Sequence, residues 1–95
     1  MKIKVRAFAS FREILGKEIE MELKEGSTVR DLLEALASSS QKLKEAAFDD
    51  SGNLLDYVLL MINRKRIDPS DPEAYLKTEL KDGDEVAIFP PVAGG

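Results

Sequence analysis

The stretch Glu85-Val86-Ala87-Ile88-Phe89-Pro90-Pro91-Val92-Ala93-Gly94-Gly95 combines a predicted strand with an extended tail. Over residues 85–89 the pattern alternates, so Val86 and Ile88 are expected to face a core and their neighbours to face outward. The two prolines that follow lack an amide donor and fix φ, so they end the strand and direct the chain away from it. These residues predict a domain whose last strand continues into a tail.

The tail consists of small residues and closes with two glycines. Gly94 and Gly95 have no Cβ, so a narrow channel in another protein can admit this backbone and place a terminal carboxylate against a bound nucleotide. A frayed chain end is the alternative, because the last residues of most domains are poorly ordered. The rigid Pro90-Pro91 pair, the Val92-Ala93 spacer and the diglycine together favour a presented carboxylate.

Composition limits both the domain number and the location. The chain has 95 residues, 43% of them hydrophobic, which is enough for one modest core but not for two. We therefore expect a single domain over residues 1–95, with 90–95 as a flexible C-terminal tail. The sequence contains no apolar run of membrane-spanning length and no secretory signal, which predicts a soluble cytoplasmic protein.

The residue types that are missing exclude much chemistry. Without cysteine the chain has no thiol nucleophile and no thiolate metal ligand, and without histidine it lacks the commonest general base. We expect no metal site and no catalytic residue, so the chain is expected to enter a reaction as a substrate. The net charge of −4 argues against general nucleic-acid binding, which needs a surplus of cations on one face.

Two strands are predicted near the start of the chain. The segment Lys2 to Phe8 alternates strictly, with its aliphatic members facing inward, and Glu18 to Leu23 does the same. If the two strands pair antiparallel, the outer carboxylates of the second lie across from the outer cations of the first and form weak ion pairs. Between the strands we expect one helical turn that Ser10 caps and Gly16 ends.

The main helix is predicted from Thr28. A threonine at the cap with Asp31 three residues later resembles a capping box, and the apolar residues Val29, Leu32, Leu33 and Leu36 then follow at helical spacing. We expect this stripe to cover the sheet. The serines at 38–40 break the pattern, and a weaker helix is expected around Leu43, Ala46 and Ala47.

The remainder of the chain is read as short strands and turns. The acidic segment Asp49 to Asn53 is expected to be a plain turn, because its oxygen ligands do not follow the spacing of a calcium loop. Tyr57 to Ile62 is an apolar run of strand length, followed by a turn over Asn63 to Arg66. Asp68 to Pro72 is expected to be a loop, and Asp82 to Asp84 a tight turn.

The order strand, strand, helix and further short strands indicates an α+β domain with one sheet and a helix on one face. The segment Leu80 to Gly95 resembles the C-terminal signature of the small sulfur-carrier subunits of molybdopterin synthase, which are ubiquitin-like proteins. Phe11 to Gly16 is similar to their first helical turn, and Thr28 to Leu33 to the start of their main helix. The resemblance implies a ubiquitin-like β-grasp fold with a mixed sheet, in which the first and last strands lie side by side and parallel at the centre.

In that fold the alternation places several apolar residues on the sheet face opposite the main helix. Such a cluster on an open sheet face commonly marks a docking surface. The alternative is that the loops around residues 38–53 or 68–77 cover it. The predicted docking residues are Phe8, Leu59, Met61, Ala87 and Phe89.

The resemblance also implies how the tail works. A ubiquitin-activating type of adenylyltransferase would use ATP to attach AMP to the carboxylate of Gly95, and a persulfide sulfur would displace AMP to leave a thiocarboxylate. The large subunit of molybdopterin synthase would pass this sulfur to a pterin precursor of molybdenum or tungsten cofactor. The resemblance thus implies that this chain binds no cofactor itself and that its partners supply the catalytic groups.

Two other functions remain open. If a lysine amine captured the same adenylate, the chain would become a protein modifier joined to its targets by an isopeptide bond, and the tail does not separate this function from sulfur transfer. The chain could instead be a β-grasp interaction module whose glycines are incidental. A sulfur carrier for thiazole synthesis fits less well, because Phe89 to Val92 looks more like the molybdopterin subunit.

Overall fold

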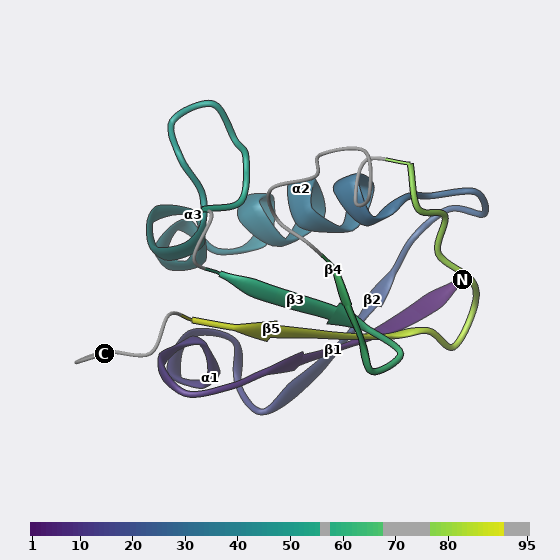
Figure 1. Ribbon diagram of the computed structural model, residues 1–95, viewed down its shortest axis with the longest axis horizontal. Helices are drawn as coiled ribbons and strands as arrows, with labels where there is room; N and C mark the ends of the chain where they lie inside the picture. The colour runs from purple at the N-terminus through teal and green to yellow at the C-terminus, as the bar shows by residue number, and fades with distance from the viewer. Residues whose placement is uncertain (56–57, 68–76, 91–95) are drawn as a thin grey trace.

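Residues 1–55, 58–67 and 77–90 are described by the computed structural model, and within them five strands form one mixed sheet in the order β2-β1-β5-β3-β4 (Figure 1). The helices α2 and α3 lie on one side of this sheet. In chain order the elements are β1 (Lys2–Ala7), α1 (Ser10–Leu15), β2 (Glu18–Glu22), α2 (Val29–Ser39), α3 (Gln41–Ala47), β3 (Leu59–Ile62), β4 (Lys65–Ile67) and β5 (Glu85–Phe89).

Strand β5 is the third of the five strands and organises the sheet. It pairs in parallel with β1 and antiparallel with β3. The first and last strands therefore lie side by side, as the β-grasp resemblance implied. The turn into β5 forms at Gly83, whose φ of 87° suits a residue without a Cβ.

The pairing of β1 with β2 is antiparallel, as predicted, but the ion pairs are diagonal. Lys2 lies opposite Glu22 and Lys4 opposite Glu20. Each ammonium group instead approaches the glutamate two residues before the one directly opposite it. Lys4 Nζ is 3.4 Å from Glu18 Oε1, and Lys2 Nζ is 3.9 Å from Glu20 Oε1. These side chains are 45–66% exposed, so each pair contributes about a few tenths of a kcal/mol at most.

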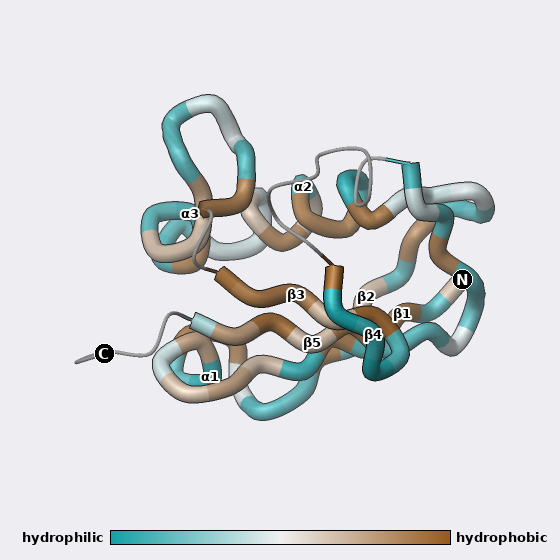
Figure 2. Tube along the Cα trace, in the orientation of Figure 1, coloured by the Kyte–Doolittle hydropathy of each residue, from teal (hydrophilic) through white to brown (hydrophobic). Residues whose placement is uncertain are grey.

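The capping box of α2 is present as predicted. The backbone N–H of Asp31 donates to Thr28 Oγ1 at 3.4 Å, and the N–H of Thr28 donates to Asp31 Oδ2 at 2.8 Å. The four residues of the predicted apolar stripe are all buried, with Val29, Leu32 and Leu36 at 0% exposure. Figure 2 shows apolar residues along the side of α2 that faces the sheet.

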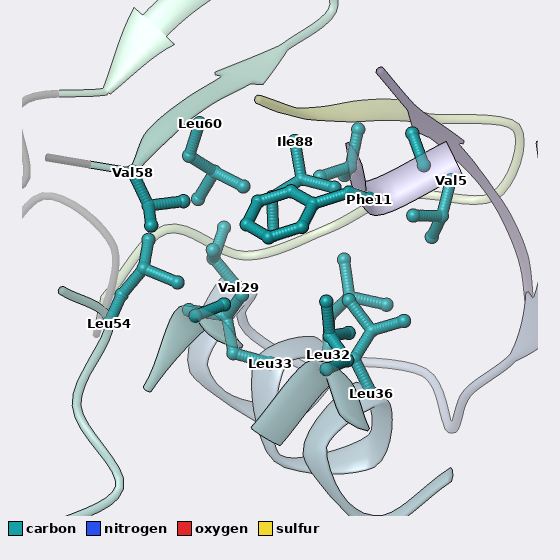
Figure 3. Close-up of a cluster of buried hydrophobic side chains, with 14 of the residues drawn as sticks. Val5, Phe11, Val29, Leu32, Leu33, Leu36, Leu54, Val58, Leu60 and Ile88 are labelled. Atoms are coloured by element: carbon teal, nitrogen blue, oxygen red, sulfur yellow. The ribbon is translucent and has the colours of Figure 1, made fainter. Parts of the chain in front are cut away.

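The core also contains a residue that the sequence did not single out. Phe11, in the six-residue helix α1, is 2% exposed, and α1 contacts β1, β2 and α3. In Figure 3 its ring lies between Ile88 of β5 and the residues of α2. The buried set also contains Ile3, Val5, Ala7, Leu43, Ala47, Phe48, Leu54, Val58, Leu60, Ile62, Leu80 and Val86.

One of the predicted helix boundaries was wrong. Ser10 does not cap α1: it is the first helical residue, and Ala9 occupies the cap without a side-chain hydrogen bond. The predicted break at serines 38–40 is confirmed, because α2 ends at Ser39. Ser40 separates α2 from α3 and caps α3, its hydroxyl accepting a hydrogen bond from the N–H of Leu43 at 3.2 Å. Within α3, Ala46 is exposed.

The third strand and its turn are shorter than predicted. Strand β3 begins at Leu59, residues 56–57 lie outside the described part, and the N–H of Val58 donates to a turn carbonyl of Leu55. The turn contains only Asn63 (φ 48°) and Arg64 (φ 70°), because two residues with positive φ suffice to close a hairpin. Lys65 and Arg66 belong to β4. The predicted loop at 68–72 lies outside the described residues.

The junction between β1 and α1 is strained. Ala9 has φ 51° and ψ −129°, a region that residues with a Cβ seldom occupy and that costs about 1–3 kcal/mol. The N–H groups of Phe11 and Arg12 donate to the carbonyls of Phe8 and Ala9 at 3.1 and 3.0 Å, so this conformation closes the turn that starts α1.

We expect Ala9→Gly to stabilise the protein by about 1 kcal/mol. Relief of the strain outweighs the extra unfolded-chain entropy of glycine, which costs about 0.4–1 kcal/mol. For a domain of this size the melting midpoint should rise by about 4–8 °C per kcal/mol. The control is Ala37→Gly inside α2, which should lower the midpoint because glycine costs about 1 kcal/mol in a helix. A melting midpoint for Ala9→Gly below that of the wild type would contradict the conclusion that the backbone of Ala9 is strained.

Candidate functional site

The chain leaves the sheet at the end of β5, where the strand is held on both sides. Phe89 pairs with Leu59 of β3, and the N–H of Phe8 donates to the carbonyl of Ile88 at 3.3 Å. Pro90 follows directly and is half-buried. The predicted tail residues beyond it, Pro91, Val92, Ala93, Gly94 and Gly95, lie outside the described residues. The point from which the tail starts is therefore fixed by the centre of the sheet.

The five predicted docking residues share the sheet face opposite α2 and are all half-buried. Phe8 follows the last residue of β1, and its ring stacks on that of Phe89, with centroids 4.2 Å apart and an interplanar angle of 11°. Leu59 lies opposite Phe89 across the β3–β5 pair, and Met61 lies opposite Ala87. The structure brings these residues together over three adjacent strands, and whether they bind a partner stays a prediction.

Two arginines that were not among the predicted site residues border the aromatic stack. The guanidinium carbons of Arg6 and Arg12 each lie 5.8 Å from the centre of the Phe8 ring, a distance at which a cation–π contact contributes about 0.5–1 kcal/mol. Arg6 Nη1 also donates to Glu85 Oε1 at 3.2 Å. Sequence spacing could have placed Arg6 on the same face as Phe8, because it lies two residues earlier in an alternating strand. The location of Arg12 beside Phe8 depends on how α1 folds back.

A hollow of about 150 Å³ lies beside the stack. Its walls come from Phe8, Phe89 and Met61, Ala87 lines it from the middle strand, and Arg6, Arg64 and Glu85 complete the lining. A larger hollow of about 500 Å³ lies at the other end of β5, between the β3–β4 hairpin and residues 78–84. Of these two hollows, the smaller one adjoins the described strand end from which the tail departs.

The described part of the chain gives no sign of a metal centre or a membrane span. Asp49 Oδ1 accepts hydrogen bonds from the N–H groups of Ser51 and Asn53, each at 2.9 Å, which confirms the predicted turn. Across residues 1–55, 58–67 and 77–90, no group of three or more acidic side chains is placed to hold a metal ion. No helix in these ranges is both long and apolar enough to cross a bilayer.

Comparison with known proteins matches residues 5–95 to the model of the ThiS family. Two curated relatives are each 36% identical over 96 residues, and each alignment covers 100% of both chains. One is small archaeal modifier protein 3 of Haloferax volcanii, and the other is the molybdopterin synthase sulfur carrier subunit of Chlamydomonas reinhardtii. A modifier and a sulfur carrier are thus equally similar to this chain.

Solved structures agree with the fold. The crystal structure of SAMP1 from Haloferax volcanii superposes with a TM-score of 0.85 at 30% identity, covering 100% of both chains. A chain in the complex of subunits 1 and 2 of molybdopterin-converting factor from Helicobacter pylori superposes with a TM-score of 0.63 at 27% identity, again covering 100% of both chains. The latter protein is seen bound to a second subunit.

Proposed function

We propose that this chain, which belongs to the ThiS family of small sulfur carriers, carries sulfur as a thiocarboxylate on Gly95 and delivers it for molybdopterin synthesis. One observation supports the proposal above all. The central strand β5, paired on both sides up to Phe89, leads directly into Pro90, and the family match continues from there through the diglycine. The globular part thus presents the tail from a rigid base.

The chemistry follows from the weakness of a carboxylate as an electrophile. Its negative charge is delocalised, so Gly95 must first be activated by a partner. An oxygen of the carboxylate attacks the α-phosphorus of ATP, pyrophosphate leaves, and an acyl adenylate forms. The terminal sulfur of a persulfide on a transferase then attacks the acyl carbon, and AMP departs with the bonding electron pair. A second thiol breaks the resulting S–S bond, which leaves the thiocarboxylate on Gly95 and a disulfide on the transferase.

Partners supply the groups that act in these steps. Carriers of the ThiS family bind no cofactor themselves, and ATP belongs to the activating enzyme. We propose two partners, an adenylyltransferase of the ubiquitin-activating type and the large subunit of molybdopterin synthase. The molybdopterin-converting factor complex of Helicobacter pylori supports the second, because the subunit with this fold is bound to another subunit there.

Protein modification is the second candidate function. The same adenylate, attacked by the amine of a target lysine, gives an isopeptide bond and releases AMP. The full-length similarity to small archaeal modifier protein 3 supports this function as strongly as the Chlamydomonas relative supports sulfur transfer. One chain can perform both reactions, because they diverge only at the nucleophile that captures the adenylate.

Intact-mass analysis of the protein isolated from its native cells tests the proposal. A sulfur carrier shows a fraction whose mass is higher by the difference between one sulfur and one oxygen, with the change located at Gly95. A modifier shows larger conjugates linked through lysine. A chain that ends in an unmodified carboxylate under every growth condition, or that continues uncleaved beyond Gly95, would rule out both functions.

The same proposal assigns partner binding to the face of Phe8, Leu59, Met61, Ala87 and Phe89. We expect Phe8→Ala to weaken binding of the activating enzyme by at least about 30-fold, which is the size of a hot-spot effect. Loss of the ring stack should cost folding only about 0.5–1.5 kcal/mol. Ile14→Ala is the control, because Ile14 is half-buried against the core in α1. It should lower the melting midpoint but leave binding unchanged, whereas equal binding losses for both variants would contradict the assignment.

A further inference from the structure

A row of outward side chains crosses the middle of the sheet, and its central member is the smallest. Arg6 of β1 and Met61 of β3 both lie opposite Ala87 of β5. Since Ala87 carries only a methyl group between two long side chains, the surface sinks there into the hollow of about 150 Å³. The Phe8 and Phe89 rings, stacked in parallel at 4.2 Å, form a wall of this hollow.

The size of the hollow limits what can fill it. An engineered apolar cavity of about 150 Å³ accommodates a benzene molecule, so this hollow accepts one aliphatic side chain or one aromatic ring. A single buried apolar anchor of this kind, surrounded by contacts that exclude water, is typical of the centre of a protein–protein interface.

The charge around the hollow is opposite in sign to that of the whole chain. Arg6, Arg12 and Arg64 surround the stack and the hollow, and of these Arg6 is paired with Glu85. Within the described residues, Arg12 and Arg64 have no ion-pair partner, although the chain as a whole carries a net charge of −4. A locally positive patch on an acidic protein favours a complementary negative surface.

We propose that the hollow over Ala87 seats one apolar side chain of the activating enzyme, and that carboxylates beside this side chain pair with Arg12 and Arg64. The inference rests on the proposed function and adds the chemistry of the partner's surface. Phe89 borders the hollow and is followed directly by Pro90. A protein seated here therefore holds the chain at the point where the tail begins, which fixes the direction of the tail into its active site.

A second copy of the chain fits this surface poorly. In a two-fold dimer through the hollow, Arg12 and Arg64 of one copy would face the same arginines of the other, and the one carboxylate in the lining, that of Glu85, already pairs with Arg6. Each copy also carries a net charge of −4, which opposes association. The charge pattern therefore selects a different protein with an acidic, partly apolar surface.

The test fills the hollow and inverts its charge. Ala87→Leu occupies the space with a side chain of this protein, and we expect it to weaken binding of the purified activating enzyme by at least about tenfold. Arg64→Glu should weaken binding at low salt, with a smaller difference from the wild type as ionic strength rises. The matched controls are Ala46→Leu on the exposed side of α3 and Arg30→Glu on α2, which make the same substitutions away from the hollow.

Two measurements, binding of the activating enzyme and conversion of the tail to a thiocarboxylate, separate this inference from the proposed function. The inference is supported if Ala87→Leu and Arg64→Glu both bind the enzyme more weakly than the wild type. The control variants should bind like the wild type, and all variants should have melting midpoints near that of the wild type. Wild-type binding by Ala87→Leu overturns it, even if the tail is still converted to a thiocarboxylate. A wild-type dimer that Ala87→Leu dissociates also overturns it, because a second copy would then be the occupant. If the wild type binds the enzyme but keeps its carboxylate when ATP and a persulfide donor are supplied, the proposed function fails while the loss of binding in Ala87→Leu still supports the hollow.

Discussion

Deletion of Gly95 is expected to abolish thiocarboxylate formation and to leave the fold unchanged. Among the described residues, the sheet ends at Phe89 and the buried core ends at Ile88, so both stay complete in the deletion variant. The deletion does move the terminal carboxylate back by one residue, about 3.3–3.6 Å along an extended chain. A misplacement of about 1 Å at a reacting centre already costs about 100-fold in rate, so the shortened tail should not be adenylated.

The measurement is intact-mass analysis after incubation with the activating enzyme, ATP and a persulfide donor. Val92→Ala is the control, because it changes a tail residue but keeps both the chain length and the diglycine. It should be converted, while the deletion variant should not, and both should melt at the wild-type temperature. Conversion of the deletion variant at the wild-type rate would show that the reacting group lies elsewhere.

The second large effect is expected for Phe11→Ala, which should destabilise the protein by about 3–5 kcal/mol. Phe11 is 2% exposed and is among the largest fully buried side chains, so its removal leaves a cavity at the centre of the core that Figure 3 shows. Typical domains have a total unfolding free energy of about 5–15 kcal/mol. A loss of this size therefore unfolds a substantial fraction of the molecules at physiological temperature.

Chemical denaturation followed by circular dichroism measures this loss. Phe11→Leu fills most of the same volume and serves as the control, which should lose less than half as much. Phe8→Ala is a second comparison, since Phe8 is half-buried on the other face of the sheet and its stacking contributes only about 0.5–1.5 kcal/mol. If Phe11→Ala and Phe8→Ala were equally destabilising, the interior position of Phe11 would be contradicted.

Sequence periodicity predicted those parts of the fold that depend on local pattern. Alternation placed Ile3, Val5 and Ala7 inside, and the Thr28–Asp31 spacing identified the capping box of α2, because each pattern reports directly on one strand or one helix end. The faces of β3 and β5 followed from the same alternation. Combined with the strand arrangement that the β-grasp resemblance implied, this alternation predicted that the five docking residues share one face.

Other features of the fold and the site depend on how separate helices and strands pack together. The sequence pattern could not predict these features. A helix of six residues is too short for a periodic signal, so neither the burial of Phe11 nor the position of Arg12 over Phe8 could be predicted. The strained backbone of Ala9 arises from the geometry that joins β1 to α1, where glycine would have been the expected residue. The hollow over Ala87 likewise results from neighbours on two other strands.

The parallel pairing of β1 with β5 has a consequence for biosynthesis. Residues 4–7 pair with residues 85–88, so the middle of the sheet joins two segments that lie far apart in the sequence. Contacts between such distant segments are slow to form, and these cannot form at all until the final strand has left the ribosome. The nascent protein thus completes its sheet only after residues 85–88 have been synthesised and released, and an enzyme that requires the assembled surface would engage the chain only after that point.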